Sequence, residues 1–244
     1  IENGLNEQQR QAIEYCSKGP LSVVSGGPGT GKTRVIANMA AAYIAGGGNP
    51  ESLKLMAPTG KAAFRLGESI NELVKSSSFD DSIISQLLDL QASTIHRAIG
   101  LNDKLPAYHR LRPMQVDMVI VDESSMIDLE LFVNLCRALP TDCKIVLVGD
   151  SNQLPPVEAG AVFTGVLNSL LQLPGVNATK LEKNYRSNTE LQELANQINQ
   201  GAKSSIKTAT VDEIHKQSGP LILSKEKTYE EHLRNWCHEA FLKG

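Results

Sequence analysis

Along this chain of 244 residues, short apolar runs alternate with longer segments in which apolar positions recur at helical spacing. The runs are continuously apolar, as expected of strands buried on both faces of a parallel sheet. They span residues 21–24, 53–56, 118–121 and 145–148. Helical spacing is found in residues 35–44, 129–136 and 191–198. This alternation is typical of stacked βαβ units, and it predicts an α/β fold with a parallel sheet flanked by helices.

Changes in this pattern subdivide the chain. Polar breaks bound residues 76–113, which we expect to leave the sheet as an insertion. Beyond residue 180 the pattern weakens into mixed helices. We therefore expect one domain over residues 1–180 and the start of a second over residues 181–244. Because the chain begins with Ile1 and not with methionine, we expect it to be a fragment of a longer protein.

Composition is that of an ordinary soluble protein, with 41% hydrophobic and 21% charged residues. No apolar run approaches the roughly 20 residues that span a bilayer, so we expect no membrane segment. The net charge of -3 means that any contact with nucleic acid must come from local loops. The four cysteines form no CxxC pair, and we expect free thiols in a cytoplasmic protein.

A glycine-rich segment, residues 26–33, fits the pattern G-x-x-x-x-G-K-[ST] and lies between an apolar strand and an amphipathic helix. Its glycines let successive main-chain N–H groups turn toward phosphates, and the helix N-terminus adds positive potential. Lys32 is expected to reach the β- and γ-phosphates, and Thr33 to offer its hydroxyl to Mg²⁺. The expected nucleotide contacts here are Gly27, Gly29, Thr30, Gly31, Lys32, Thr33 and Arg34.

Two adjacent carboxylates follow the apolar run 118–121, at the carboxyl edge of the expected sheet. Phosphoryl transfer requires charge neutralisation and a positioned nucleophile. We expect Asp122 to hold Mg²⁺ and Glu123 to orient and polarise the attacking water.

The nucleotide base is expected to be adenine, because no Asn-Lys-x-Asp segment of the kind that reads guanine is present. A carboxamide can pair with the amino group and N7 of adenine, which makes Gln9 a candidate base reader. Asn6 followed three residues later by Gln9 also fits a helix-capping arrangement, so both interpretations stay open.

Seven segments carry a resemblance to a known family. In order they are LNEQQRQAI, SGGPGTGKT, APTGKAAFRL, STIHRAIG, VIVDESSMID, VGDSNQLPPVEAGAVF and LEKNYRS. This order resembles that of the superfamily 1 DNA helicases. The residues within the segments resemble those of the RecD-like branch, which includes subunits of exodeoxyribonuclease V. The resemblance covers residues 5–205 and implies a P-loop NTPase with a RecA-like sheet, followed by the start of a second RecA-like motor domain.

The resemblance also implies roles for further residues. Gln153 resembles the glutamine that senses the γ-phosphate, although it could simply close a loop. Tyr185 resembles an adenine-stacking aromatic residue. Arg186 resembles an arginine that contacts the γ-phosphate from the second motor domain, and its alternative is a surface ion pair.

Two clusters are candidates for contact with single-stranded DNA. Pro58, Thr59 and Lys61 follow the second apolar run and open a helix, so that the hydroxyl, the ammonium group and the amides could bind an anion. The second cluster consists of Ser93, Thr94, His96 and Arg97, in which hydroxyls and a basic group could follow a DNA backbone. His96 on its own is more often a structural histidine than a nucleic-acid contact. The resembled family makes that anion a phosphate of single-stranded DNA.

Together these features predict an ATP- and Mg²⁺-dependent 5′–3′ DNA helicase subunit of double-strand break repair and recombination, with partner subunits of the RecB and RecC type. Two later motifs of the family are not in the sequence, so we expect the fragment to bind ATP and to lack full activity. A stand-alone RecD-like, Pif1-like or conjugative helicase is one alternative. The other is a non-catalytic ATP-binding scaffold subunit, which the hydrolytic residues argue against.

Overall fold

The computed structural model describes residues 4–101, 106–154, 156, 160–170, 177–185, 208–209 and 223–224. The chain divides into two compact units, residues 1–186 and 187–244. In the second unit, the described residues form a short parallel pair, β7 (Thr208–Ala209) and β8 (Leu223–Ser224). The expected helix at 191–198 lies outside the described residues. The assignment of the second unit to a motor domain stays a prediction.

The first unit is built on a six-stranded parallel sheet with strand order β3-β2-β4-β5-β1-β6. The strands are β1 (Leu21–Gly26), β2 (Leu53–Ala57), β3 (Ala92–Thr94), β4 (Met118–Val121), β5 (Lys144–Gly149) and β6 (Asn177–Leu181). All four apolar runs are strands, and they are the four central ones, where both faces are covered. The expected α/β fold with a parallel sheet is confirmed.

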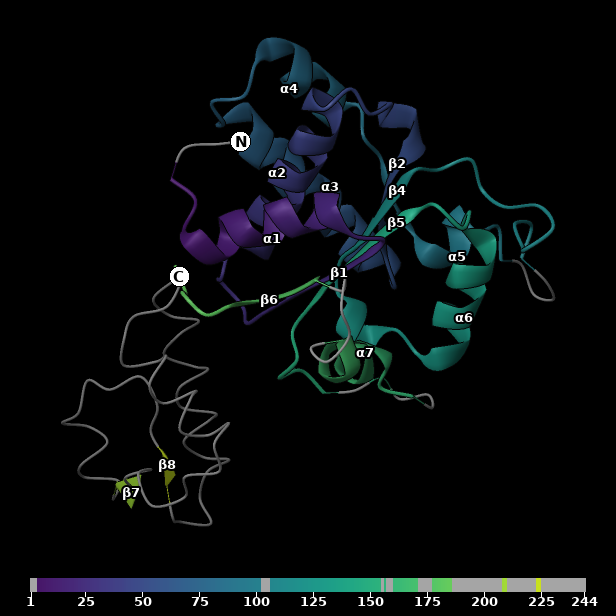
Figure 1. Cartoon of the computed structure of the whole chain (residues 1–244). Helices are drawn as coiled ribbons and strands as arrows, with labels where there is room; N and C mark the ends of the chain where they lie inside the picture. The colour runs from purple at the N-terminus through teal and green to yellow at the C-terminus, as the bar shows by residue number, and fades with distance from the viewer. Residues whose placement is uncertain are drawn as a thin grey trace, which may run out of the picture. The chain divides into compact units, whose positions relative to one another are not determined.

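Helices cover both faces of this sheet (Figure 1). One face carries α1 (Glu7–Lys18), α2 (Lys32–Ala45), α3 (Gly60–Lys75) and α4 (Asp81–Leu88). The other carries α5 (Ile95–Ala98), α6 (Leu129–Ala138) and α7 (Val162–Leu170). Among the helices that the structure describes, none is both long and apolar enough to cross a bilayer.

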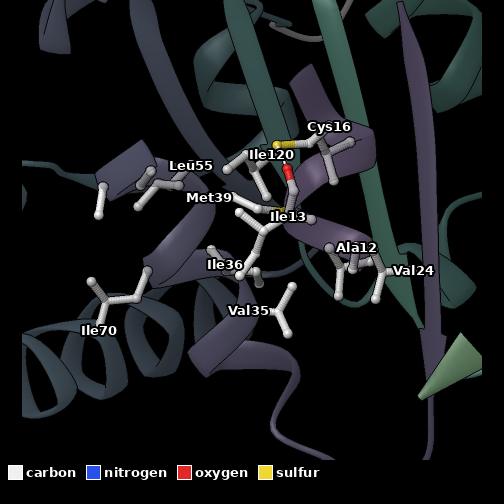
Figure 2. Packing of buried hydrophobic residues seen from close by; sticks show 14 of the residues in the cluster. Ala12, Ile13, Cys16, Val24, Val35, Ile36, Met39, Leu55, Ile70 and Ile120 are labelled. Carbon is white, nitrogen blue, oxygen red and sulfur yellow. Dashed lines mark hydrogen bonds between the residues drawn. The ribbon is translucent and has the colours of Figure 1, made fainter. Parts of the chain in front are cut away.

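Each face of the sheet has its own apolar core. In the core beneath α1 to α4, Ile36 and Met39 of α2 are fully buried and lie near Ile13 and Cys16 of α1 (Figure 2). Full burial of one such aliphatic side chain contributes about 1.5–3 kcal/mol. Burial also raises the pKa of the Cys16 thiol to about 11, with Lys144 opposing the shift, so this cysteine stays protonated at neutral pH. The stripe predicted in residues 35–44 is therefore a core face.

The segment 76–113, expected to leave the sheet, returns to it at β3. Leu55 pairs with Ala92, and Ala57 pairs with Thr94, so that β3 is an edge strand beside β2. The expectation was wrong for residues 92–94 because an edge strand needs no continuous apolar run. β6, at the opposite edge and also short of apolar residues, was missed for the same reason.

Because the strands are parallel, their carboxyl ends share one edge of the sheet. The glycine-rich loop follows β1 there, the two carboxylates follow β4, and the Gln153 loop follows β5. The segments expected to carry the chemistry therefore lie at a single edge.

Candidate nucleotide-binding site

The glycine-rich loop joins β1 to α2, and five consecutive carbonyl oxygens within it, those of residues 26–30, accept hydrogen bonds. Two donors belong to the segment itself: Lys32 Nζ bonds to Gly26 O (2.8 Å) and Gly27 O (3.2 Å), and Thr30 Oγ1 bonds to Gly27 O (2.8 Å). Two donors follow β6: Asn184 Nδ2 bonds to Pro28 O and Tyr185 N to Gly29 O, both at 2.8 Å. The last is Gln9 Nε2 of α1, which bonds to Thr30 O (3.2 Å). With its carbonyl oxygens engaged, the loop can offer its main-chain N–H groups to an anion.

Gly31 shows why this loop requires glycine. Its φ is 84°, in the left-handed region, and a Cβ at this position would lie 2.6 Å from Nε2 of Gln9. Gly31 is also the residue from which α2 begins. Any side chain would therefore both strain the backbone and displace Gln9 from the loop.

Asp122 lies at the end of β4 with its Oδ1 atom buried and without a hydrogen-bond partner in the described part of the chain. Burial is the main cause that raises the pKa of Asp122 to about 6, and the neighbouring Glu123 carboxylate also raises it. The hydrogen bond from the main-chain N–H of Glu123 and the positive charge of Lys32 lower this pKa. A buried carboxylate oxygen without a hydrogen-bond partner suits a divalent cation. The described residues hold no cluster of three or more metal-ligating side chains, so Mg²⁺ would take Thr33, Asp122 and oxygens of the nucleotide and water.

Glu123 has φ 52° and ψ 36°, and it is the one non-glycine residue with positive φ among those described. A left-handed conformation costs an L-residue roughly 1–2 kcal/mol, and such strain is concentrated at functional sites. Its carboxylate accepts a hydrogen bond of 3.4 Å from Gln153 Nε2, and Gln153 Oε1 accepts one of 3.1 Å from Ser125. The expected γ-phosphate sensor therefore lies directly against the expected water-positioning carboxylate.

Gln9 makes the capping arrangement that the sequence allowed. The Asn6 side chain accepts a hydrogen bond from Gln9 N (2.8 Å), and Gln9 Oε1 accepts one from Asn6 N (3.1 Å). Gln9 is 2% exposed and still lines the cleft in front of the loop. The capping interpretation is confirmed, and the adenine-reading role stays a prediction that requires Gln9 to exchange a protein contact for the base.

Tyr185 stands at the same cleft with 51% of its surface exposed. Its hydroxyl accepts a hydrogen bond of 2.9 Å from Asn6 Nδ2, and Lys183 Nζ lies 5.1 Å from the centre of its ring. An exposed ring fixed at its hydroxyl and its main chain is suited to stacking on a planar base.

A cleft of about 640 Å³ brings most of the expected residues together. Those that line it are Gln9, Gly29, Gly31, Lys32, Thr33, Arg34, Asp122, Glu123, Gln153 and Tyr185. Gly27 and Thr30 do not line it; Thr30 is buried and donates its hydroxyl to the loop. Arg186 lies outside the described residues.

The two expected DNA-contacting clusters lie elsewhere, at the ends of β2 and β3. Since Ala57 and Thr94 are paired, Thr59 and His96 each follow a paired residue by two positions at the same edge of the sheet. The hydroxyls of Thr59 and Thr94 accept helix-capping hydrogen bonds from Ala62 N (3.2 Å) and Arg97 N (3.1 Å). Each hydroxyl proton remains available to a phosphate oxygen, and Lys61 and His96 are exposed.

Several residues that sequence reasoning missed support these sites. Asn184 and Ser125 hold the loop and Gln153, and Asn6 positions both Gln9 and Tyr185. Phe64, 65% exposed, lies one turn beyond Lys61 on α3. The contacts of Asn184 and Ser125, and that of Asn6 with Tyr185, could not be predicted because the partners are distant in sequence. The cap between Asn6 and Gln9 was expected from their spacing. An isolated apolar residue on the polar face of α3 was the available signal for Phe64.

The sequence that forms this site matches a known protein family. A family model described as "AAA domain" matches residues 9–159, more than half of the chain. The chain belongs to the AAA domain family. The match includes the glycine-rich loop, both carboxylates and Gln153.

Individual proteins similar to this chain include RecD and RecD2 proteins. RecBCD enzyme subunit RecD of Haemophilus influenzae is 38% identical over 160 residues, 64% of this chain and 25% of that protein. RecBCD enzyme subunit RecD of Mycobacterium tuberculosis is 35% identical over 205 residues, 81% of this chain and 35% of that protein. The ATP-dependent RecD2 DNA helicase of Deinococcus radiodurans is 33% identical over 196 residues, 78% of this chain and 23% of that protein. The expected resemblance to RecD-like helicases is confirmed, and the chain spans roughly a quarter to a third of these relatives' length.

Solved structures agree on the fold. Pif1 helicase from Bacteroides in complex with ADP-AlF3 and ssDNA matches with a TM-score of 0.53 and 19% identity, over 92% of this chain and 52% of that chain. Bacteroides sp Pif1 in complex with ADP-AlF4 matches with a TM-score of 0.52 and 20% identity, over 86% and 48% of the two chains. At this identity the likeness confirms a P-loop, RecA-like fold and carries no more.

The left-handed conformation of Glu123 predicts an unusual ranking of variants. The free energy of unfolding of Glu123→Gly should be about 1 kcal/mol higher than that of Glu123→Ala, because glycine adopts a φ of 52° without strain and alanine does not. Chemical denaturation measures both. Glu130, in the first turn of α6, is the matched control, and there glycine should be less stable than alanine by about 1 kcal/mol. The same order at both positions would show that Glu123 is not strained.

The raised pKa of Asp122 predicts that this carboxylate destabilises the nucleotide-free protein. The pKa of Asp122 is about 6 in the folded protein, against an ordinary value of 3.8, so the folded state binds this proton more tightly than the unfolded state does. The free energy of unfolding therefore falls as pH rises from 4 through 6 and the carboxyl group loses its proton. Asp122→Asn should therefore be more stable than the unsubstituted chain at pH 7.5, by about 1–3 kcal/mol, and the difference should shrink toward pH 4. Denaturation across pH measures it, with exposed Asp142→Asn as control. An advantage that does not change with pH would contradict the account.

Proposed function

We propose that this chain is the ATP-binding and ATP-hydrolysing core of a 5′–3′ DNA helicase subunit of the RecD type. The observation that carries the proposal is the single cleft in which the glycine-rich loop, Asp122, Glu123 and Gln153 meet. A phosphate cradle, a carboxylate for a metal and a second carboxylate for water form the minimal set for hydrolysis of a nucleoside triphosphate.

Each residue of the cleft has a role that its contacts support. Lys32 would exchange the Gly26 and Gly27 carbonyls for the β- and γ-phosphates, and Thr33 and Asp122 would hold Mg²⁺. The cation, when bound, neutralises phosphate charge. Glu123 would orient the attacking water, while Gln9 and Tyr185, which line the same cleft, would contact adenine.

Gln153 would couple hydrolysis in the cleft to a change in protein conformation. It contacts Glu123 through its amide nitrogen and Ser125 through its oxygen. Loss of the γ-phosphate would change the surroundings of all three groups together. We infer that Gln153 transmits this change, and that Arg186 contributes a cation to the γ-phosphate.

Single-stranded DNA would lie over the ends of β2 and β3. Pro58, Thr59, Lys61, Thr94 and His96 supply the hydroxyls, the ammonium group and the ring at this edge. The path is next to the nucleotide cleft because β2 neighbours β4, which carries Asp122. Phosphate contacts of this kind give affinity without base specificity.

The biological setting follows from the relatives' names. RecBCD enzyme subunits among them favour a cytoplasmic complex with subunits of the RecB and RecC type, acting in double-strand break repair and recombination. A stand-alone helicase is the second candidate, favoured by the 33% identity to a RecD2 DNA helicase. A non-catalytic scaffold is disfavoured because Lys32, Asp122 and Glu123 line one cleft.

Lys32→Ala tests the nucleotide site. It should abolish calorimetric binding of Mg-ATP, because the phosphates lose their cation. Glu123→Gln should retain that binding, since the amide keeps the shape of the side chain. Glu14→Gln, on the exposed surface of α1, is the control for a lost charge. Mg-ATP binding by Lys32→Ala equal to that of the unsubstituted chain would refute the proposed cleft.

Lys61→Ala tests the DNA path. The salt dependence of binding to oligodeoxythymidylate, measured by fluorescence anisotropy, should lose about 0.7 from its logarithmic slope when one phosphate contact is removed. Lys75→Ala, at the other end of α3, should leave the slope unchanged. Equal slopes for Lys61→Ala, Lys75→Ala and the unsubstituted chain would exclude Lys61 as a DNA contact.

A further inference from the structure

A second cavity, of about 750 Å³, lies beside the edge strand β3 and shares no lining residue with the nucleotide cleft. Its walls come from β2, β3, α5 and residues 108–116. We call it the Arg112 cavity, after one of its three cations, Lys54, Arg97 and Arg112. None of the expected nucleotide contacts lines it; of the expected DNA contacts, Ser93 and Arg97 do, whereas Lys54, Tyr108 and Arg112 had no expected role.

The charge of the Arg112 cavity is one-sided. Its twelve lining residues include these three cations and no aspartate or glutamate, although the whole chain carries a net charge of -3. Within the described part of the chain, none of the three cations forms an ion pair with a carboxylate. Lys54 is half-buried between the buried residues Leu53 and Leu55 of β2. Three cations without counter-charges around one hollow favour an anionic ligand.

An aromatic ring accompanies the cations. Tyr108 lines the cavity, is half-buried and packs against the apolar core beneath α5 and α6. Gln91, Ser93 and Gln115 add polar side chains to the lining. Cations interleaved with an aromatic side chain are the arrangement that binds single-stranded nucleic acid, where phosphates pair with the cations and bases stack on the ring.

The cavity continues the DNA path proposed above. Ser93 and Arg97 line it, and they flank Thr94 and His96 on the same seven-residue stretch formed by β3 and α5. We propose that the Arg112 cavity is a second contact region for the backbone of single-stranded DNA, with Arg97 and Arg112 on phosphates and Tyr108 against a base. This inference rests on the proposed DNA-binding function.

The neighbouring surface limits the path. An adjoining hollow shares Lys54, Gln91 and Gln115 with the cavity but is also lined by Glu51 and Asp89. Carboxylates repel phosphates, so the DNA strand would leave the protein near Lys54 and not continue past it. The proposal therefore places one end of the DNA contact at Lys54.

Arg112→Ala tests the proposal in the full 244-residue chain, with oligodeoxythymidylate as the probe. Its logarithmic salt slope for binding should fall by about 0.7, the value of one single-strand phosphate contact, with Mg-ATP binding unchanged. Arg110→Ala is the matched control, because Arg110 lies in the same exposed turn but does not line the cavity. Tyr108→Phe should retain binding, and Tyr108→Ala should weaken it at all salt concentrations.

The outcomes separate this inference from the function on which it rests. If Lys61→Ala lowers the slope while Arg112→Ala matches Arg110→Ala, the DNA-binding function stands and the Arg112 cavity is excluded from it. If the unsubstituted chain does not bind the oligonucleotide at low salt, both are wrong. A loss in Arg112→Ala that appears only with a blunt duplex would assign the cavity to double-stranded DNA and overturn the single-strand proposal.

Discussion

Five consecutive carbonyl oxygens of the glycine-rich loop are held by hydrogen bonds, and the geometry of the cleft depends on them. Their donors come from the loop itself, from α1 through Gln9, and from the segment after β6 through Asn184 and Tyr185. The bonds from Asn184 and Tyr185 to the loop can persist when Lys32 and Gln9 turn to the nucleotide, so the loop loses little conformational entropy on binding a phosphate. Segments separated by up to 156 residues in sequence therefore cooperate in one anion site.

The same contacts connect the base site, the phosphate site and the boundary between the two units. Asn6 caps α1, positions Gln9 against the loop and binds the hydroxyl of Tyr185. Tyr185 is the second-last residue of the first unit. A nucleotide that stacks on Tyr185 and displaces Gln9 would alter both ends of this network.

Sequence patterns predicted the centre of this fold better than its borders. The four central strands are continuously apolar because helices cover both of their faces, whereas the edge strands β3 and β6 need no such run and were missed. The glycine-rich loop and Asp122 follow from local spacing, so the sequence sufficed to place them. The left-handed backbone of Glu123 and the bond from Asn184 to Pro28 depend on the surrounding packing, which no local pattern records.

We propose above all that the main-chain amides of the glycine-rich loop bind phosphate. Main-chain amide chemical shifts, recorded by nuclear magnetic resonance while ADP and Mg²⁺ are added, test this most directly. The largest changes are predicted at Gly29, Gly31 and Lys32, followed by Asn184 and Tyr185 through their bonds to the loop. Changes confined to residues around the Arg112 cavity, with the loop amides unaffected, would contradict the central claim.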